Sequence, residues 1–251
     1  MKLSIITVVF NAKSLFELTH QSVICQSFQD FEYVVIDGQS TDGFVEALPN
    51  YEGIDQWISE PDKGIYDAMN KGLALAKGDY VLFLNAGDCL LSESSLQSVF
   101  DHLPPATDII FAETMMVDDA RHHLGLRSEL TSRKLPQVLN KNAFAEGMVV
   151  CHQAFMPKRS LCEPYNLAYR HSADYNWCLE ILSKSKQCKR FETPLVEYLV
   201  GGHSAKHLKA SLKERWAIMK NHYGWMGTVK AHLFIAARTL GRKFHGQQNQ
   251  W

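Results

Sequence analysis

Residues 3–9, LSIITVV, form a continuous run rich in β-branched side chains close to the start of the chain. Similar runs follow at 32–37 (EYVVID), 56–59 (QWIS) and 80–85 (YVLFLN). Runs that are apolar on both faces are typical of buried parallel strands. Helical patterns over 13–26, 42–48 and 65–76 separate them. The alternation predicts an α/β fold with a mostly parallel central sheet flanked by helices.

The rest of the chain is less regular. A helix and a strand are expected within 90–112, strands at 147–157 and 190–199, and a helix at 172–185. A basic helical pattern runs over 206–244, with breaks near Gly224 and Gly227. We therefore expect a domain over 1–204 and a helical extension over 205–251.

Composition narrows the class of protein. The chain has 251 residues, of which 46% are hydrophobic and 21% charged, as in an ordinary globular protein. No apolar run approaches the roughly 20 residues of a spanning helix, and the first apolar run is short for a signal peptide, so a cytoplasmic protein is expected. The six cysteines show no C-x-x-C spacing, which favours reduced thiols over a zinc site.

Charge is unevenly distributed. Residues 205–251 hold nine of the 26 Lys and Arg residues but only one of the 27 acids, Glu214, which leaves net charges of +8 on this segment and −9 on residues 1–204. Aromatic side chains are interleaved with these bases. A basic, aromatic helix suits an anionic membrane surface, although the helix face of a soluble domain or an oligomer contact would share the pattern. The acidic body and the absence of a reading motif argue against nucleic acid.

Acidic residues follow three of the four predicted strands. Asp37, Asp62 and Asp88 come after the second, third and fourth strands. Since the carboxyl ends of parallel strands meet at one edge, where open α/β sheets bind ligands, these acids are expected to converge. Converging carboxylates repel one another unless a cation or a donor-rich ligand compensates, so this edge is the predicted site.

Two strand-end motifs have structural alternatives. The motif DGQSTDG (37–43) is a good strand-to-helix turn, or it lets Asp37 bind a base or ribose. In FLNAGD (83–88), Asp88 either caps the next helix or holds Mg²⁺ or Mn²⁺ together with substrate phosphates. No G-x-G-x-x-G or Walker-type loop is present, which argues against a dinucleotide dehydrogenase or an NTPase. A metal with a nucleotide diphosphate points instead to nucleotide-sugar chemistry.

At this point the sequence resembles a known family. LSIITVVFN, VVIDGQSTDG, SEPDKGIYDAMNKGLALAKGDYVLFLNAGD and CHQAFM are together similar to the inverting family 2 glycosyltransferases of GT-A fold, in particular the branch of colanic-acid-type and other bacterial surface-polysaccharide enzymes. The resemblance covers residues 1–204 in order. It implies transfer of a sugar from a UDP- or GDP-sugar to a hydroxyl of a lipid-linked or oligosaccharide acceptor, on the inner face of the cell membrane.

The resemblance also implies roles for individual residues. Asp88 takes the metal-binding place, with Mn²⁺ or Mg²⁺ as cofactor, and Asp174 the place of the base that activates the acceptor, although Ser-Ala-Asp is also a normal helix start. His152 either contacts the acceptor or is a satisfied half-buried histidine on a strand. The implied donor-binding set is Thr7, Phe10, Asn11, Asp37, Ser40, Asp62, Lys63, Gly64, Asp67, Asn70, Lys71, Asn85, Ala86, Gly87 and His203.

Two departures from the family pattern affect this assignment. Met69 stands where many members have Arg, and Asn85-Ala86-Gly87-Asp88 keeps only the last acid of the D-x-D element. The rival functions are a nucleotidyltransferase on a related sheet and a non-catalytic protein that binds sugar nucleotides.

Overall fold

A computed structural model of the chain describes residues 1–201 and 208–244, with side chains for 1–201 and 209–237. Its first sheet has the order β3 (Gln56–Ser59), β2 (Phe31–Asp37), β1 (Leu3–Val9) and β4 (Tyr80–Phe83), and every pair is parallel. All seven residues of β1 are buried. The four strands predicted from the apolar runs are confirmed, and so is the parallel arrangement.

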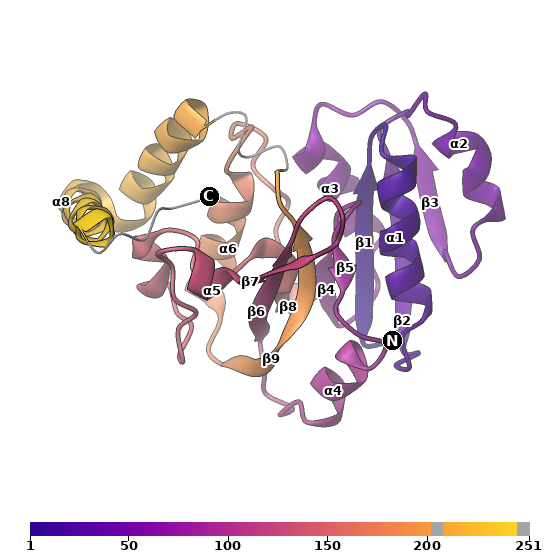
Figure 1. The fold of residues 1–251 in the computed structure, drawn as a ribbon, viewed down its shortest axis with the longest axis horizontal. Helices are drawn as coiled ribbons and strands as arrows, with labels where there is room; N and C mark the ends of the chain where they lie inside the picture. The colour runs from indigo at the N-terminus through magenta and orange to yellow at the C-terminus, as the bar shows by residue number, and fades with distance from the viewer. Residues whose placement is uncertain (202–207, 245–251) are drawn as a thin grey trace.

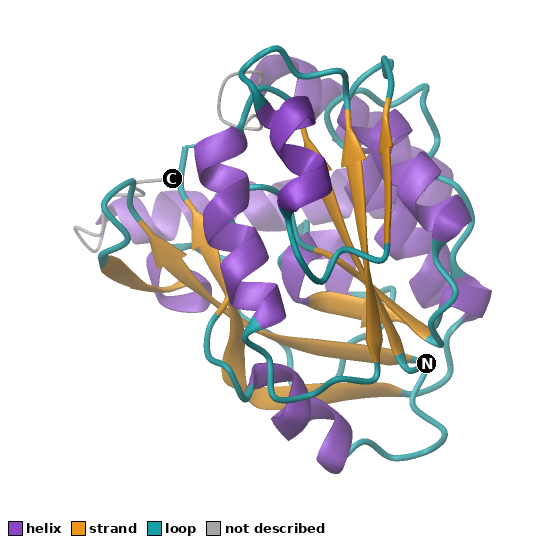
Figure 2. Ribbon diagram, turned by 90° about the vertical axis from the view of Figure 1, so that its right-hand side faces the viewer, coloured by secondary structure: helices purple, strands orange, loops and turns teal. Residues whose placement is uncertain are grey.

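Helices cover both faces of this sheet (Figures 1 and 2). One face of β1 packs with α1 (Lys13–Ile24) and α2 (Phe44–Ala47), and the other with α3 (Ile65–Leu75). The close approach of α3 depends on Gly72, because a Cβ there would lie 2.4 Å from Cγ2 of Ile6. Two apolar cores, one on each face, fix the sheet between these layers.

A second sheet follows in the order β5 (Cys89–Leu90), β9 (Cys188–Leu199), β6 (Ile109–Val117) and β7 (His123–Leu126), and β8 (Phe155–Pro157) also pairs with β6. The β6–β9 pair is parallel and the others are antiparallel. A bridge between Tyr80 and Lys158 links the two sheets. The remaining helices are α4 (Ser95–Asp101), α5 (Arg127–Leu130), α6 (Ala173–Lys184) and α8 (Leu208–Phe244).

Some expected elements differ from those observed. The strand predicted over 147–157 is present only as β8, since Met148–Val150 are buried in a loop and 152–154 form a 3₁₀ turn. Its apolar pattern reflects burial rather than strand pairing. The break predicted near Gly224 is confirmed, with φ of 71°, whereas Gly227 lies within the helix. In the described part of the chain, no helix is both long enough and apolar enough to cross a bilayer.

Candidate active site

Asp37, at the end of β2, organises the first loop of the site. Its carboxylate is fully buried and accepts hydrogen bonds from the N–H and hydroxyl of Ser40 and, at 2.7 Å, from the hydroxyl of Ser59. Ser40 Oγ accepts the N–H of Asn11 at 2.8 Å, and Asn11 Oδ1 accepts the N–H of Thr41 at 2.8 Å. Asp37 therefore orders the turn, and its predicted contact with a base or ribose stays a prediction.

Thr7 lies beneath this loop rather than in it. Its side chain is fully buried on the face of the sheet that α1 covers, where its hydroxyl donates to the carbonyl of Leu84 at 2.7 Å and accepts from Tyr33 at 3.1 Å. The burial of Thr7 does not support the predicted contact with a base, which stays a prediction. The alternation of side chains along β1 sends position 7 into the core.

Phe10, Gly38 and Asp62 form an open cradle beside the loop. The Phe10 side chain is 65% exposed. A Cβ on Gly38 would lie 2.4 Å from Oδ2 of Asp62 and 3.2 Å from the Phe10 ring. An exposed ring next to a carboxylate offers a stacking face for a base and an acceptor for ribose hydroxyls.

The loop between β3 and α3 is held by its own polar residues. Asp62 Oδ1 accepts the N–H of Gly64 at 2.8 Å, and Asp67 Oδ2 accepts the N–H of Lys63 at 2.9 Å. Gly64 has φ of 121°, a region that favours glycine. Lys63 and Gly64 are exposed at the start of α3, a helix terminus whose partial positive charge suits a phosphate.

Three side chains of the same stretch have structural partners. Lys71 pairs with Glu60 at 3.0 Å and donates to the carbonyl of Pro61, which fastens α3 to the preceding loop. Asn70 donates to the carbonyl of Tyr165 at 3.0 Å and accepts its N–H at 2.6 Å. These hydrogen bonds give Asn70 a structural role, and its predicted contact with the donor stays a prediction. Met69 is 2% exposed in the core, so no phosphate contact comes from that position.

The turn Asn85-Ala86-Gly87-Asp88 follows β4. The Asp88 N–H donates to the carbonyl of Asn85 at 2.9 Å, and Gly87 has φ of 99°. Asp88 is 5% exposed; it accepts hydrogen bonds from Gln153 at 2.7 Å and from the N–H of Leu199 at 3.0 Å. Burial raises the pKa of this carboxyl to about 7, against the opposing effect of these hydrogen bonds. Asp88 is therefore a tertiary junction and not a helix cap.

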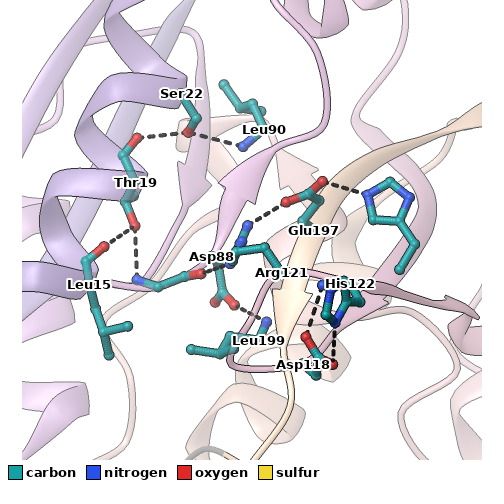
Figure 3. A network of polar contacts seen from close by, with 12 residues as sticks. Leu15, Thr19, Ser22, Asp88, Leu90, Asp118, Arg121, His122, Glu197 and Leu199 are labelled. Carbon is teal, nitrogen blue, oxygen red and sulfur yellow. Dashed lines mark hydrogen bonds and ion pairs between the residues drawn. The ribbon is translucent and has the colours of Figure 1, made fainter.

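Arg121, from the loop between β6 and β7, fixes the same turn (Figure 3). Its guanidinium donates to the carbonyl of Gly87 at 2.6 Å and pairs with Glu197 of β9. His123 lies 2.8 Å from the other oxygen of Glu197. Arg121 has φ of 65°, so the backbone adopts an uncommon conformation to deliver this side chain. Its positive charge also lowers the pKa of Asp88, though less than burial raises it.

Whether this turn fits a divalent cation depends on its oxygen atoms. Asn85 Oδ1 is buried and accepts no hydrogen bond from the described residues, and Asp88 supplies a carboxylate in the same turn. Hard oxygen donors of this kind suit Mg²⁺ or Mn²⁺. Among the described residues, no three His, Cys, Asp or Glu side chains gather as a metal site. The donor set therefore fits a cation that shares its coordination with substrate phosphates and water.

Asp174 lies in the first turn of α6 and is half-buried. Its Oδ1 accepts hydrogen bonds from the Tyr66 hydroxyl at 3.0 Å and from the N–H of Tyr175 at 2.8 Å. Its Oδ2 accepts none from the described part of the chain. Burial, followed by the charge of Asp174, raises the pKa of Tyr66 well above its usual range, so the phenol remains a donor. The arrangement fixes one carboxylate oxygen and leaves the other available to a proton.

His152 lies in a buried aromatic cluster with Phe83, Tyr165 and Trp177. Its Nε2 is 2.7 Å from the Tyr165 hydroxyl, and burial lowers the pKa of the ring to about 4. The side chain is 6% exposed. This environment favours the structural alternative over the predicted contact with an acceptor. The predicted strand at this position is replaced by a 3₁₀ turn.

Two predicted donor residues remain. Ala86 is half-buried and packs against the core beneath α1. His203 lies outside the described residues.

The sequence analysis did not identify four residues that lie beside the candidate site: Tyr66, Arg121, Gln153 and Tyr198. Burial raises the pKa of the Tyr198 phenol, and the charges of Cys151, Asp88 and Asp174 raise it further. This residue precedes Leu199, whose N–H binds Asp88. Of the four, Tyr66 alone had a local signal, because it lies between the polar residues at the start of α3.

Comparison with known proteins identifies the family. The family model described as glycosyl transferase family 2 matches residues 4–165, so the chain belongs to this family. A PGL/p-HBAD biosynthesis glycosyltransferase of Mycobacterium bovis is 30% identical over 199 residues, which cover 75% of this chain and 72% of the relative. A putative teichuronic acid biosynthesis glycosyltransferase of Bacillus subtilis is 40% identical over 89 residues, 34% of this chain and 35% of the relative. The chain is a glycosyltransferase by family. Asp174 lies beyond the residues that the family model matches.

Solved structures support the fold. S. aureus TarS residues 1–349 in complex with UDP has a TM-score of 0.70 and 15% identity, with 95% of this chain and 71% of that one covered. The mannosyltransferase PcManGT of Pyrobaculum calidifontis, in complex with GDP-Man and Mn²⁺, has a TM-score of 0.61 and 15% identity, with 95% and 75% covered. The expected GT-A arrangement is confirmed. The narrower resemblance to colanic-acid-type enzymes stays a prediction.

Proposed function

We propose that this protein is an inverting glycosyltransferase that moves one sugar from a UDP- or GDP-sugar to a hydroxyl of a lipid-linked or oligosaccharide acceptor in the assembly of a bacterial surface glycan. The observation that carries the proposal is the geometry of Asp174. Tyr66 and Tyr175 hold its Oδ1, and Oδ2 accepts no hydrogen bond from the described residues. This is the arrangement expected of a general base.

The donor would lie along the carboxyl edge of the first sheet. The Phe10 ring stacks on the base, Asp62 accepts from the ribose, and Lys63 with the N-terminus of α3 faces the diphosphate. These placements rest on the exposed side chains of Phe10 and Lys63 and on the half-buried Asp62 between them. The structural neighbours that contain UDP, UDP-GlcNAc or GDP-Man support a nucleotide-sugar donor.

Asn85 and Asp88 would hold Mn²⁺ or Mg²⁺, which when bound stabilises negative charge on the leaving diphosphate. Two structural neighbours contain Mn²⁺. Asp174 Oδ2 takes the proton of the acceptor hydroxyl as its oxygen forms a bond to the anomeric carbon. The bond from that carbon to the diphosphate oxygen breaks at the same time, and the nucleoside diphosphate leaves. Attack from the opposite face inverts the anomeric centre.

The relatives described as PGL/p-HBAD and teichuronic acid biosynthesis glycosyltransferases support an acceptor of this class. We also propose that the enzyme works at the inner face of the cell membrane.

The test is Asp174→Asn. We expect transfer to fall by about 10²–10⁴-fold, the usual contribution of a general base, while the affinity for UDP or GDP changes little. Nucleoside diphosphate as the released product supports the proposal, whereas pyrophosphate would indicate a nucleotidyltransferase. Binding of the donor without transfer to any acceptor hydroxyl would indicate a non-catalytic protein. Full activity in the variant would remove Asp174 from the mechanism.

A further inference from the structure

The C-terminal helix α8 consists of two segments that meet at Gly224. This glycine has φ of 71° and ψ of 176°, which interrupts the helix between residues 223 and 225. Figure 1 shows α8 at the end of the molecule opposite α2 and β3, with its two segments running in different directions. Each segment therefore presents its own outer face.

The first segment is anchored to the body of the protein. Ser211, Ile218 and Met219 are buried, and the Tyr223 hydroxyl donates to the carbonyl of Lys141 at 2.6 Å. These contacts give this part of α8 a fixed orientation relative to the body of the protein.

Glu214 is the one acid of the tail, and its side chain is turned inward. Its two oxygens accept the N–H groups of Arg170 and His171, each at 2.9 Å, just before α6 begins. The outer face of this segment instead carries Lys209, Lys213 and Lys220, all exposed, whose spacing of four and seven residues places them on one side of the helix. The basic charge of the tail is therefore not neutralised by an acid of its own helix.

The second segment exposes large apolar side chains. Trp225 is 61% exposed, Met226 84% and Leu233 67%. Met226, Lys230 and Leu233 lie at positions i, i+4 and i+7, on one face, and Lys230 is also exposed. Trp225 packs its edge against Trp216 of the first segment, with ring centroids 5.8 Å apart. We call Trp225, Met226, Lys230 and Leu233 the tail patch. It is an apolar surface that contains a positive charge.

We propose that the tail patch lies in the headgroup region of an anionic membrane, with the lysines of the first segment facing the lipid phosphates. In such a membrane the apolar side chains are removed from water, and the lysines are attracted to the anionic headgroups. A second copy of this chain is a poorer occupant, because the tail patch contains no acid that could pair with Lys230 of the other copy in a two-fold contact.

The inference deepens the proposed function and rests on it for the identity of the acceptor. The Glu214 contacts hold α8 against the residues that lead into α6, the helix that bears Asp174. A membrane-bound tail would thus keep the general base close to the surface where a lipid-linked hydroxyl is presented.

The test measures binding of the full chain to vesicles of phosphatidylcholine, with or without phosphatidylglycerol. We expect binding to the anionic vesicles only, weakening as salt is raised. The double variant Met226→Glu/Leu233→Glu should weaken binding to vesicles by about tenfold or more, since two apolar side chains that the membrane would bury are lost. Val138→Glu is the matched control, because Val138 is 72% exposed and lies outside α8; it should bind as the parent does.

Three results would overturn the proposal: equal binding to neutral vesicles, binding unchanged in the double variant, or a concentration-dependent dimer that the double variant abolishes. Transfer to a soluble acceptor should be equal in the parent and the double variant. Vesicle binding needs no turnover, so a failed membrane proposal can be told apart from a failed transferase assignment.

Discussion

The hydroxyl of Tyr66 on α3 donates a hydrogen bond to Oδ1 of Asp174 on α6, at 3.0 Å and across 108 residues of sequence. This contact joins α3, which follows the loop that holds Asp62 and Lys63, to the candidate base. It assigns Tyr66 a positioning role, because the phenol orients the carboxylate without occupying the oxygen that would take the proton.

Replacing Tyr66 with Phe should therefore slow turnover more than it weakens donor binding. A hydrogen bond to a charged group contributes about 1.5–3 kcal/mol, so we expect kcat to fall by about tenfold or more. Steady-state kinetics would show the donor KM almost unchanged. A variant that lost donor affinity and kept kcat would place Tyr66 in the donor pocket instead. Tyr175→Phe, which keeps the backbone N–H to Asp174, is the control.

The affinity for Mn²⁺ should depend on pH through Asp88. Burial raises the pKa of this carboxyl from 3.8 to about 7, so below pH 7 a proton competes with the cation. We expect the dissociation constant for Mn²⁺ to increase by up to about tenfold per unit of pH below 7 and to level off above it. Calorimetric titration at several pH values would measure this, and proton release on binding should fall at high pH.

The raised pKa of Asp88 also determines how the free energy of unfolding depends on pH. The folded-state pKa of Asp88 lies above the unfolded value, so its contribution to the free energy of unfolding is full below about pH 4 and is lost as pH rises through 7. A cation should restore stability more strongly at pH 8 than at pH 6. An equal thermal shift at the two values would contradict the assignment of Asp88 as a ligand.

Arg121 should affect the affinity for Mn²⁺ although it would not contact the ion. Its guanidinium holds the carbonyl of Gly87, the residue before Asp88. Groups that orient metal ligands commonly change affinity by about 10–100-fold, and we expect Arg121→Ala to raise the dissociation constant for Mn²⁺ within that range. Paramagnetic resonance of free Mn²⁺ would report it without turnover. His122→Ala is a matched control on the same loop, since the His122 side chain is 77% exposed, and should leave Mn²⁺ affinity unchanged.

Phe10→Ala should weaken donor binding and leave stability nearly unaltered. The ring is 65% exposed, so little burial is lost in the absence of a ligand. Stacking of a base on an aromatic ring contributes about 1–3 kcal/mol, so the dissociation constant for UDP or GDP should rise by about tenfold. Thermal stability with and without nucleotide would measure both effects together.

Asn70→Ala should have the opposite effect to Phe10→Ala, with stability lowered and donor binding retained. Loss of two hydrogen bonds to the backbone of Tyr165 should cost about 1–3 kcal/mol of stability and lower Tm, with nucleotide affinity retained. A loss of nucleotide binding without a change in Tm would return Asn70 to the donor site.

The sequence by itself determined the central sheet. The run at 3–9 is apolar on both faces, and the same burial that selects such residues also requires helices on both sides, so a parallel sheet flanked by helices followed. The strand order comes from the structure. It also determined that polar residues gather at the carboxyl ends of the strands. Local pattern failed at 147–157, because a buried loop and a buried strand share the same apolar composition.

Only the tertiary structure decided which polar residues face the site. Asn70 and Phe10 both looked like donor contacts, yet Asn70 fastens a loop and Phe10 stands open, because the partner at Tyr165 lies 95 residues away. Asp88 was visible in the sequence, whereas the contacts with Gln153 and Leu199 that surround it come from distant segments. Hydrogen bonds and desolvation act through space, so spacing along the chain can bring an acid to the right edge but does not fix its partners or its pKa.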